Sequence, residues 1–122
     1  MSNMKPNLDL HELLPRDRND VASVRQLIEL GFPQVEPLIP HLFEWLKSNG
    51  SPVEVALRPL LAATGEPAIP LVRSILRSSH GLWKASVLTH VVSAWPLACV
   101  RELRIELEAE LQNYNFYGTD VV

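Results

Sequence analysis

The chain has 122 residues, of which 47% are hydrophobic and 20% charged, a composition that excludes a disordered chain and fits one globular domain with a buried core. Its net charge of −3, without a run of Lys or Arg, argues against nucleic acid as the main partner, because phosphate binding requires a basic patch. A single cysteine excludes an internal disulfide framework, and no apolar run has the length of a signal peptide or membrane span, so the cytoplasm is the expected location.

Apolar residues recur at helical spacing between Gly and Pro interruptions, which predicts an all-α chain without strands. We expect a flexible N-terminus over residues 1–7, one helical domain over residues 8–112 and a C-terminal tail over residues 113–122. The tail keeps three aromatic residues but shows no periodicity.

Capping residues mark the first helices. A short helical turn is expected over residues 8–14, directly before Pro15. Either Asn19 or Asp20 can cap the helix that follows. That helix ends at Gly31, a residue type suited to the left-handed conformation that closes many helices.

Prolines shape the middle of the chain. They predict an opening turn over residues 33–36 and a helix over residues 37–48, because proline is tolerated in a first helical turn but not in a helix interior. The next helix has the strongest start in the chain. Ser51 is a capping residue, Pro52 occupies the first helical position, and Glu54 completes a capping box.

The second half of the chain predicts three more helices. Pro59 lies inside the helix that begins at Pro52, and it predicts a kink there. Later helices are expected from Pro67, over residues 82–94 and from Pro96 to Leu111. The last of them carries three carboxylates on one face, which we interpret as solvated charge: Glu102, Glu106 and Glu110.

Two stretches of the chain match each other at a spacing of 34 residues, with Gly31 and Pro33 corresponding to Gly65 and Pro67. A helix–turn–helix unit buries its apolar face only against stacked neighbours. The spacing also suits tetratricopeptide repeats, but their Trp-x-x-Leu-Gly-x-x-Tyr pattern is missing, and proline after the turn favours HEAT-like pairs. We therefore predict a HEAT-like α-α superhelix of about three stacked antiparallel helix pairs. The third helix pair is atypical, since SAWP (93–96) replaces the Gly-x-Pro turn.

No residues converge in a pattern typical of catalysis. His41 and Glu44 lie three apart on one helix, but a zinc site needs three or four ligands and no second pair appears. Cys99 has apolar neighbours, so a buried small residue is the better interpretation than a nucleophile with His90 as its base. The sequence therefore predicts no catalytic residues, no metal, no cofactor and no enzymatic activity.

Trp83 is the best candidate for an interface anchor, because it follows the polar segment 78–81 and has cationic neighbours. Core packing is the alternative interpretation for each tryptophan. The candidate protein-binding residues are, first, Arg58, Arg77, His80, Trp83 and Lys84 and, second, Arg16, Asp17 and Arg18.

Five segments stand in a characteristic order and spacing: LLPRDRND (13–20), LGFPQVEPLIPHLFEWL (30–46), SPVEVALRPLL (51–61), TGEPAIPLV (64–72) and LWKASVLTHVVSAWP (82–96). Through them the chain resembles a bacterial family of unknown function, DUF5071, over residues 8–110. The resemblance implies a helical-repeat fold without an assigned enzymatic activity. Small bacterial domains of this kind occur beside toxins as immunity proteins, so the resemblance also suggests that role. The loop SSHGLW (78–83) departs from the family, in which an acidic or amide-rich loop precedes the tryptophan.

These observations favour a protein-binding module that binds neither nucleic acid nor membranes and is monomeric or homodimeric. Its most concrete form is an immunity protein that binds and neutralises a cognate toxin. The alternative is an accessory or scaffolding domain, in which the aromatic residues 114–117 pack against a second copy or cover their own helix.

Overall fold

The computed structural model describes the backbone of residues 10–119 and the side chains of residues 10–112. Within this range the chain is all-helical, as predicted, and contains no strand. The expectation for residues 1–7 lies outside the described part. The α-helices are α1 (Val21–Leu30), α2 (Ile39–Glu44), α3 (Pro52–Ala62), α4 (Ile69–Arg77), α5 (Gly81–His90), α6 (Leu97–Arg101) and α7 (Arg104–Thr119).

Short 3-10 helices join several of these elements. Three of them, Glu36–Leu38, Trp45–Lys47 and Glu66–Ala68, extend α2 and α4 into longer helical segments, as the prolines predicted. The others are Leu10–Leu13, in the expected short turn, and Val92–Ala94, which follows α5.

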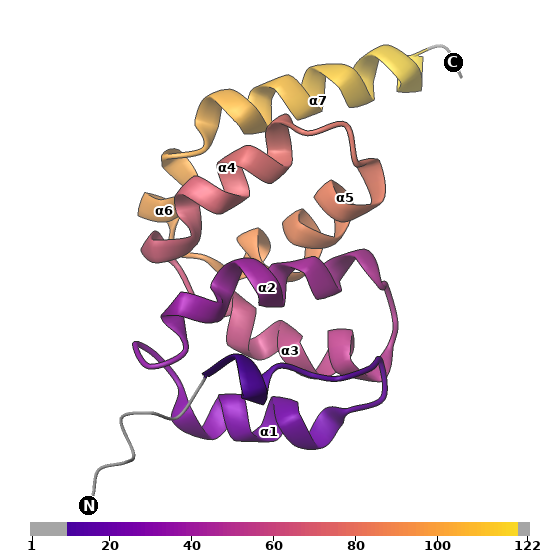
Figure 1. Ribbon diagram of the computed structural model, residues 1–122. Helices are drawn as coiled ribbons and strands as arrows, with labels where there is room; N and C mark the ends of the chain where they lie inside the picture. The colour runs from indigo at the N-terminus through magenta and orange to yellow at the C-terminus, as the bar shows by residue number, and fades with distance from the viewer. Residues whose placement is uncertain (1–9, 120–122) are drawn as a thin grey trace, which may run out of the picture.

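The helices stack in layers from α1 at one end to α7 at the other (Figure 1). Helix α3 packs against α1 and α2, and α4 packs against α5 and α7. One continuous core runs through these layers, and Leu27, Phe43, Leu57 and Ile75 are among its fully buried side chains. The arrangement is compatible with a HEAT-like superhelix. None of the helices in the described range is both long and apolar enough to cross a membrane.

The predicted helix starts are confirmed. Asp20 caps α1 by accepting a hydrogen bond of 3.3 Å from the backbone N–H of Ser23. Ser51 caps α3, because its hydroxyl oxygen accepts from the N–H of Glu54 at 3.2 Å. The Glu54 carboxylate returns to the N–H of Gly50 at 2.9 Å, one residue before the cap. Local sequence therefore determines where these helices begin.

The repeat holds at 34 residues only up to the turn. Gly31 and Gly65 both have positive φ, 65° and 63°, a conformation that favours glycine after a helix. Beyond them the spacing is 30 residues, since α2 begins at Ile39 and α4 at Ile69. The matching segments are EPLIP (36–40) and EPAIP (66–70). The first turn thus contains four more residues than the second. The predicted match of Pro33 with Pro67 was therefore wrong, because Pro37 takes the equivalent place.

The last predicted helix, from Pro96 to Leu111, is interrupted. Glu102 and Leu103 donate backbone hydrogen bonds three residues back, and the chain turns there to bury Leu103 completely before α7 begins. Leu111, which the periodicity placed on the apolar face, is 58% exposed. Helix α7 also continues to Thr119, past the expected domain boundary at residue 112. Pro59 lies inside α3, where the kink stays a prediction.

Candidate protein-interaction surface

Glu106 of α7 is buried between two arginines of α4, and its side chain is only 6% exposed. Arg77 donates from Nη2 and Nε to Glu106 Oε2 at 2.7 and 3.1 Å. Arg73 places its Nε 3.6 Å from Glu106 Oε1 and donates from Nη2 to the carbonyl oxygen of Glu102 at 2.6 Å. The interpretation of Glu106 as solvated charge was therefore wrong, because contacts from a distant helix remove it from water.

The environment of Glu106 favours its ionised form. Burial acts to raise the pKa of this carboxyl, but the hydrogen bonds from Arg77, the backbone N–H of Glu106 and the charges of Arg77 and Arg73 outweigh it. The pKa of Glu106 consequently lies below its ordinary value of 4.5. At neutral pH Glu106 is a fixed negative charge that holds both guanidinium groups in place.

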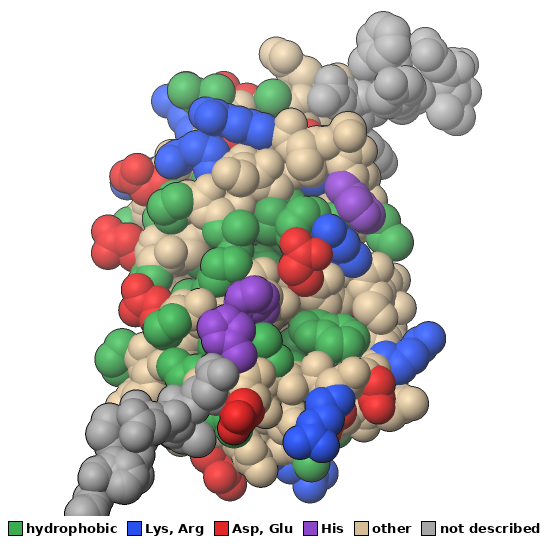
Figure 2. Space-filling model, viewed as in Figure 1, with side chains coloured by type: hydrophobic (Ala, Val, Ile, Leu, Met, Phe, Trp, Pro, Cys, Tyr) green, Lys and Arg blue, Asp and Glu red, His purple; other side chains and the backbone are tan. Residues whose placement is uncertain are grey.

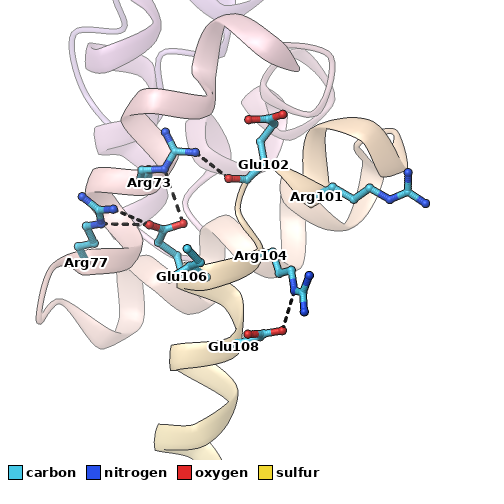
Figure 3. Close-up of a pocket in the computed structure, with 8 residues that line it drawn as sticks. Arg73, Arg77, Arg101, Glu102, Arg104, Glu106 and Glu108 are labelled. Atoms are coloured by element: carbon cyan, nitrogen blue, oxygen red, sulfur yellow. Dashed lines mark hydrogen bonds and ion pairs between the residues drawn. The ribbon is translucent and has the colours of Figure 1, made fainter.

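Around this network lies a surface that we call the arginine face, an open hollow of about 860 Å³. Figure 3 shows Arg73 and Arg77 pointing from α4 toward Glu106, whereas Arg101 of α6 extends away from that pair. Lys and Arg side chains gather at this end of the stack, near the start of α7 (Figure 2). The arginine face consists of Arg73, Arg77, Arg101, Glu102, Arg104, Ile105, Glu106 and Glu108.

The arginines of this face differ in how they are held. Arg104 pairs with Glu108 at 3.0 Å, and both side chains are largely exposed. Arg101 has no hydrogen-bond or ion-pair partner for its side chain among the described residues. A second hollow, of about 350 Å³, shares Arg77 and Ile105 with the arginine face and extends it toward Lys84. Ile105 is 76% exposed, so an apolar side chain stands where the two hollows meet.

The structure places Trp83 in a connecting role. Its indole N–H donates to the carbonyl oxygen of Phe43 at 2.8 Å, and the ammonium of Lys47 lies 4.1 Å from its ring centroid. The His80 ring stands edge-on to Trp83, with centroids 5.9 Å apart, and its Nδ1 accepts from the backbone N–H of Trp83 at 3.3 Å. These contacts join α5 to Phe43 of α2 and to Lys47 in the 3-10 segment that follows α2. Lys84 is similarly engaged, with Glu110 at 2.8 Å.

The remaining candidates lie elsewhere. Arg58 pairs with the fully buried Glu54 at 2.7 Å, within α3. Arg16 and Asp17 make local hydrogen bonds ahead of α1, and the carbonyl of Arg18 accepts from the N–H at the start of α3. The structure thus brings together Arg77, His80, Trp83 and Lys84 around the α4–α5 connection, and separates them from the candidates beside α1 and α3.

Sequence reasoning missed Arg73, Arg101, Arg104 and Ile105. The available signal for Arg73 was its spacing from Arg77, which lies four residues further along on the same face of α4. Nothing in the sequence indicated that the arginines of α4 lie beside those at the junction of α6 and α7. Elsewhere in the described range, no group of three or more His, Cys, Asp or Glu side chains is arranged to hold a metal ion.

Comparison with known proteins gives one match. No curated protein and no solved structure is similar to the chain at a significant level. A family model does match, over residues 13–115, which is most of the chain and agrees with the segments that carry the resemblance. The chain belongs to the family described as a domain of unknown function, DUF5071.

Proposed function

We propose that this chain is a cytoplasmic, non-enzymatic protein-binding module, most concretely an immunity protein that binds and neutralises a cognate toxin. The observation that carries the proposal is the arginine face, where Arg73 and Arg77, held by Glu106, line the same hollow as the exposed Ile105. Arginine is enriched among residues that dominate protein–protein binding energy, and an apolar centre with a polar rim is the usual anatomy of such surfaces.

The fold supports this role because it presents the face without rearrangement. Arg73 and Arg77 are held by Glu106 before any partner arrives, so little side-chain entropy is lost on binding. Stacked helices keep α4, α6 and α7 in fixed relation, which makes a broad preorganised surface.

The test is capture of a partner from the native bacterium with tagged chain, identification by mass spectrometry, and calorimetry with both purified proteins. For the immunity role, co-expression of the chain must also relieve the growth arrest that the captured protein causes alone. Arg77→Ala/Ile105→Ala, both on the arginine face, is the test variant, and Arg25→Ala, an exposed residue of α1, is the matched control. A captured protein whose expression is harmless contradicts the immunity role but not the binding module.

The alternative is an accessory or scaffolding domain that forms a homodimer. It is favoured by an apolar hollow of about 360 Å³ between α5 and α7, lined in part by Ala85, Leu88, Leu107 and Leu111. Light scattering at increasing protein concentration separates the two. A mass that doubles with concentration supports the dimer, and a constant monomer mass contradicts it.

A further inference from the structure

We propose that the arginine face docks an acidic segment of a partner protein, which presents carboxylates to the arginines and an apolar side chain to Ile105. This inference rests on the proposed function, because it names the surface and the chemistry by which the binding module recognises its partner.

The first argument is the supply of unused hydrogen-bond donors. A guanidinium group carries five N–H donors, and Arg77 uses only those on Nε and Nη2 for Glu106. Its side chain is 67% exposed, so the remaining donors face solvent. Arg101 has none of its side-chain donors engaged within the described part of the chain. Carboxylates match the planar fork of arginine and accept from it in pairs.

The second argument is local charge. Four arginines and three glutamates line the hollow, which leaves one positive charge in excess on a chain whose net charge is −3. Glu106 is buried and committed to Arg73 and Arg77, so it offers an incoming carboxylate little exposed negative charge. The face is therefore attractive to anionic groups although the whole chain is acidic.

The third argument selects protein over nucleic acid. Glu102 and Glu108 stand among the arginines and interrupt the positive charge, which therefore does not match the closely spaced phosphates of a nucleic-acid strand. Ile105 gives a protein side chain an apolar contact at the junction of the two hollows. Alternating carboxylates and apolar groups, which a peptide supplies and a phosphate backbone does not, fit this pattern.

The experiment measures fluorescence anisotropy of a labelled short peptide of alternating acidic residues and leucine. The comparison probes are a peptide with lysine at each acidic position and a single-stranded oligothymidylate. Arg101→Ala/Arg104→Ala is the main variant, because neither side chain holds Glu106, and Ile105→Ala tests the apolar contact. Arg25→Ala on α1 is the control.

We expect the acidic peptide to bind, and the double arginine variant to weaken its binding by about tenfold. Ile105→Ala is expected to weaken it by about threefold, because one modest apolar contact is lost. Arg25→Ala should change nothing, and the lysine peptide should not bind. Absent binding of the acidic peptide, equal binding by the double variant, or tighter binding of oligothymidylate each overturns the inference.

A second arm separates this inference from the proposed function. In the capture experiment, a partner retained by Arg101→Ala/Arg104→Ala overturns the docking inference and leaves the binding module in place. If the acidic peptide binds through the arginine face but the chain captures no protein, the proposed function fails and the chemistry of the face stands.

Discussion

Glu54 and Glu106 are both buried and both paired with arginine, but they are held in different ways. Glu54 contacts Arg58 one turn along the same helix and the N–H of Gly50 just before it. Glu106 contacts arginines 29 and 33 residues away, on a different helix. The first network stabilises one helix start, whereas the second joins the last helix to the body and orients a surface. The comparison teaches that similar chemistry serves local folding in one region and long-range assembly in the other.

The largest effect is expected at the local network. Replacing Glu54 with alanine leaves Arg58 without its partner and the N–H of Gly50 without its acceptor, and we expect a loss of about 3 kcal/mol in the free energy of unfolding. Chemical denaturation measures it. Glu44→Ala is the control, since Glu44 forms an exposed pair with Lys47 that is worth about 0.5 kcal/mol. Equal losses in the two variants would show that burial of Glu54 contributes nothing.

Replacing Glu106 with alanine is expected to cost less, about 2 kcal/mol, because the arginines it releases remain accessible to water. Hydrogen exchange should also accelerate in α7 while the amides of α1 stay protected. Glu108→Ala, which breaks only the exposed pair with Arg104, serves as the control. Exchange that accelerates equally in all helices would mean that Glu106 supports the whole fold rather than α7.

The sequence predicted the Ser51–Glu54 cap of the first network and nothing of the second network, for a physical reason. It indicated Arg58 as a protein-binding candidate and not as the partner of Glu54. The capping box places Ser51 and Glu54 three residues apart, and helical geometry brings such residues together regardless of the rest of the fold. Contact between Glu106 and Arg77 depends on how α7 crosses α4. That crossing follows from the break between α6 and α7 at Leu103, which an uninterrupted apolar periodicity concealed.

The internal repeat likewise shows that sequence predicts local features but not the arrangement that depends on distant residues. The glycines that end the first helices, Gly31 and Gly65, were predicted from residue type alone. The register beyond them depends on the length of the turn, and four additional residues after Gly31 changed it. The prediction of the candidate site was the least accurate, because Trp83 and Lys84 make contacts within the molecule.

A smaller effect on the free energy of unfolding is expected at Trp83, which joins α5 to α2. Trp83→Phe removes the hydrogen bond to the carbonyl of Phe43, and we expect a loss of about 1 kcal/mol. Thermal or chemical denaturation measures the loss. Trp45→Phe is the matched control, because the Trp45 indole N–H donates no hydrogen bond within the described residues. If the two variants lose the same stability, the indole hydrogen bond does not stabilise the contact between α5 and α2.

The smallest effect concerns pH. Burial acts to raise the pKa values of Glu54 and Glu106, but hydrogen bonds from arginine outweigh it, and both pKa values lie below the ordinary 4.5. The folded state therefore binds these protons less readily than the unfolded state. Their stabilisation is present above about pH 4.5 and is lost as the pH falls through the folded-state values. Denaturation from about pH 6 to about pH 3 should show a shallower decline for Glu54→Ala/Glu106→Ala than for the natural chain.

The most direct test of the central claim is hydrogen exchange of the chain with and without its captured partner. The account predicts that binding protects the amides of residues 73–77 and 101–108, on either side of the buried Glu106, and leaves those of α1 unchanged. Protection centred on residues 16–18 or on the Trp83 segment instead would contradict it. In that case the arginine face would only attach α7 to α4 and would not be the docking surface.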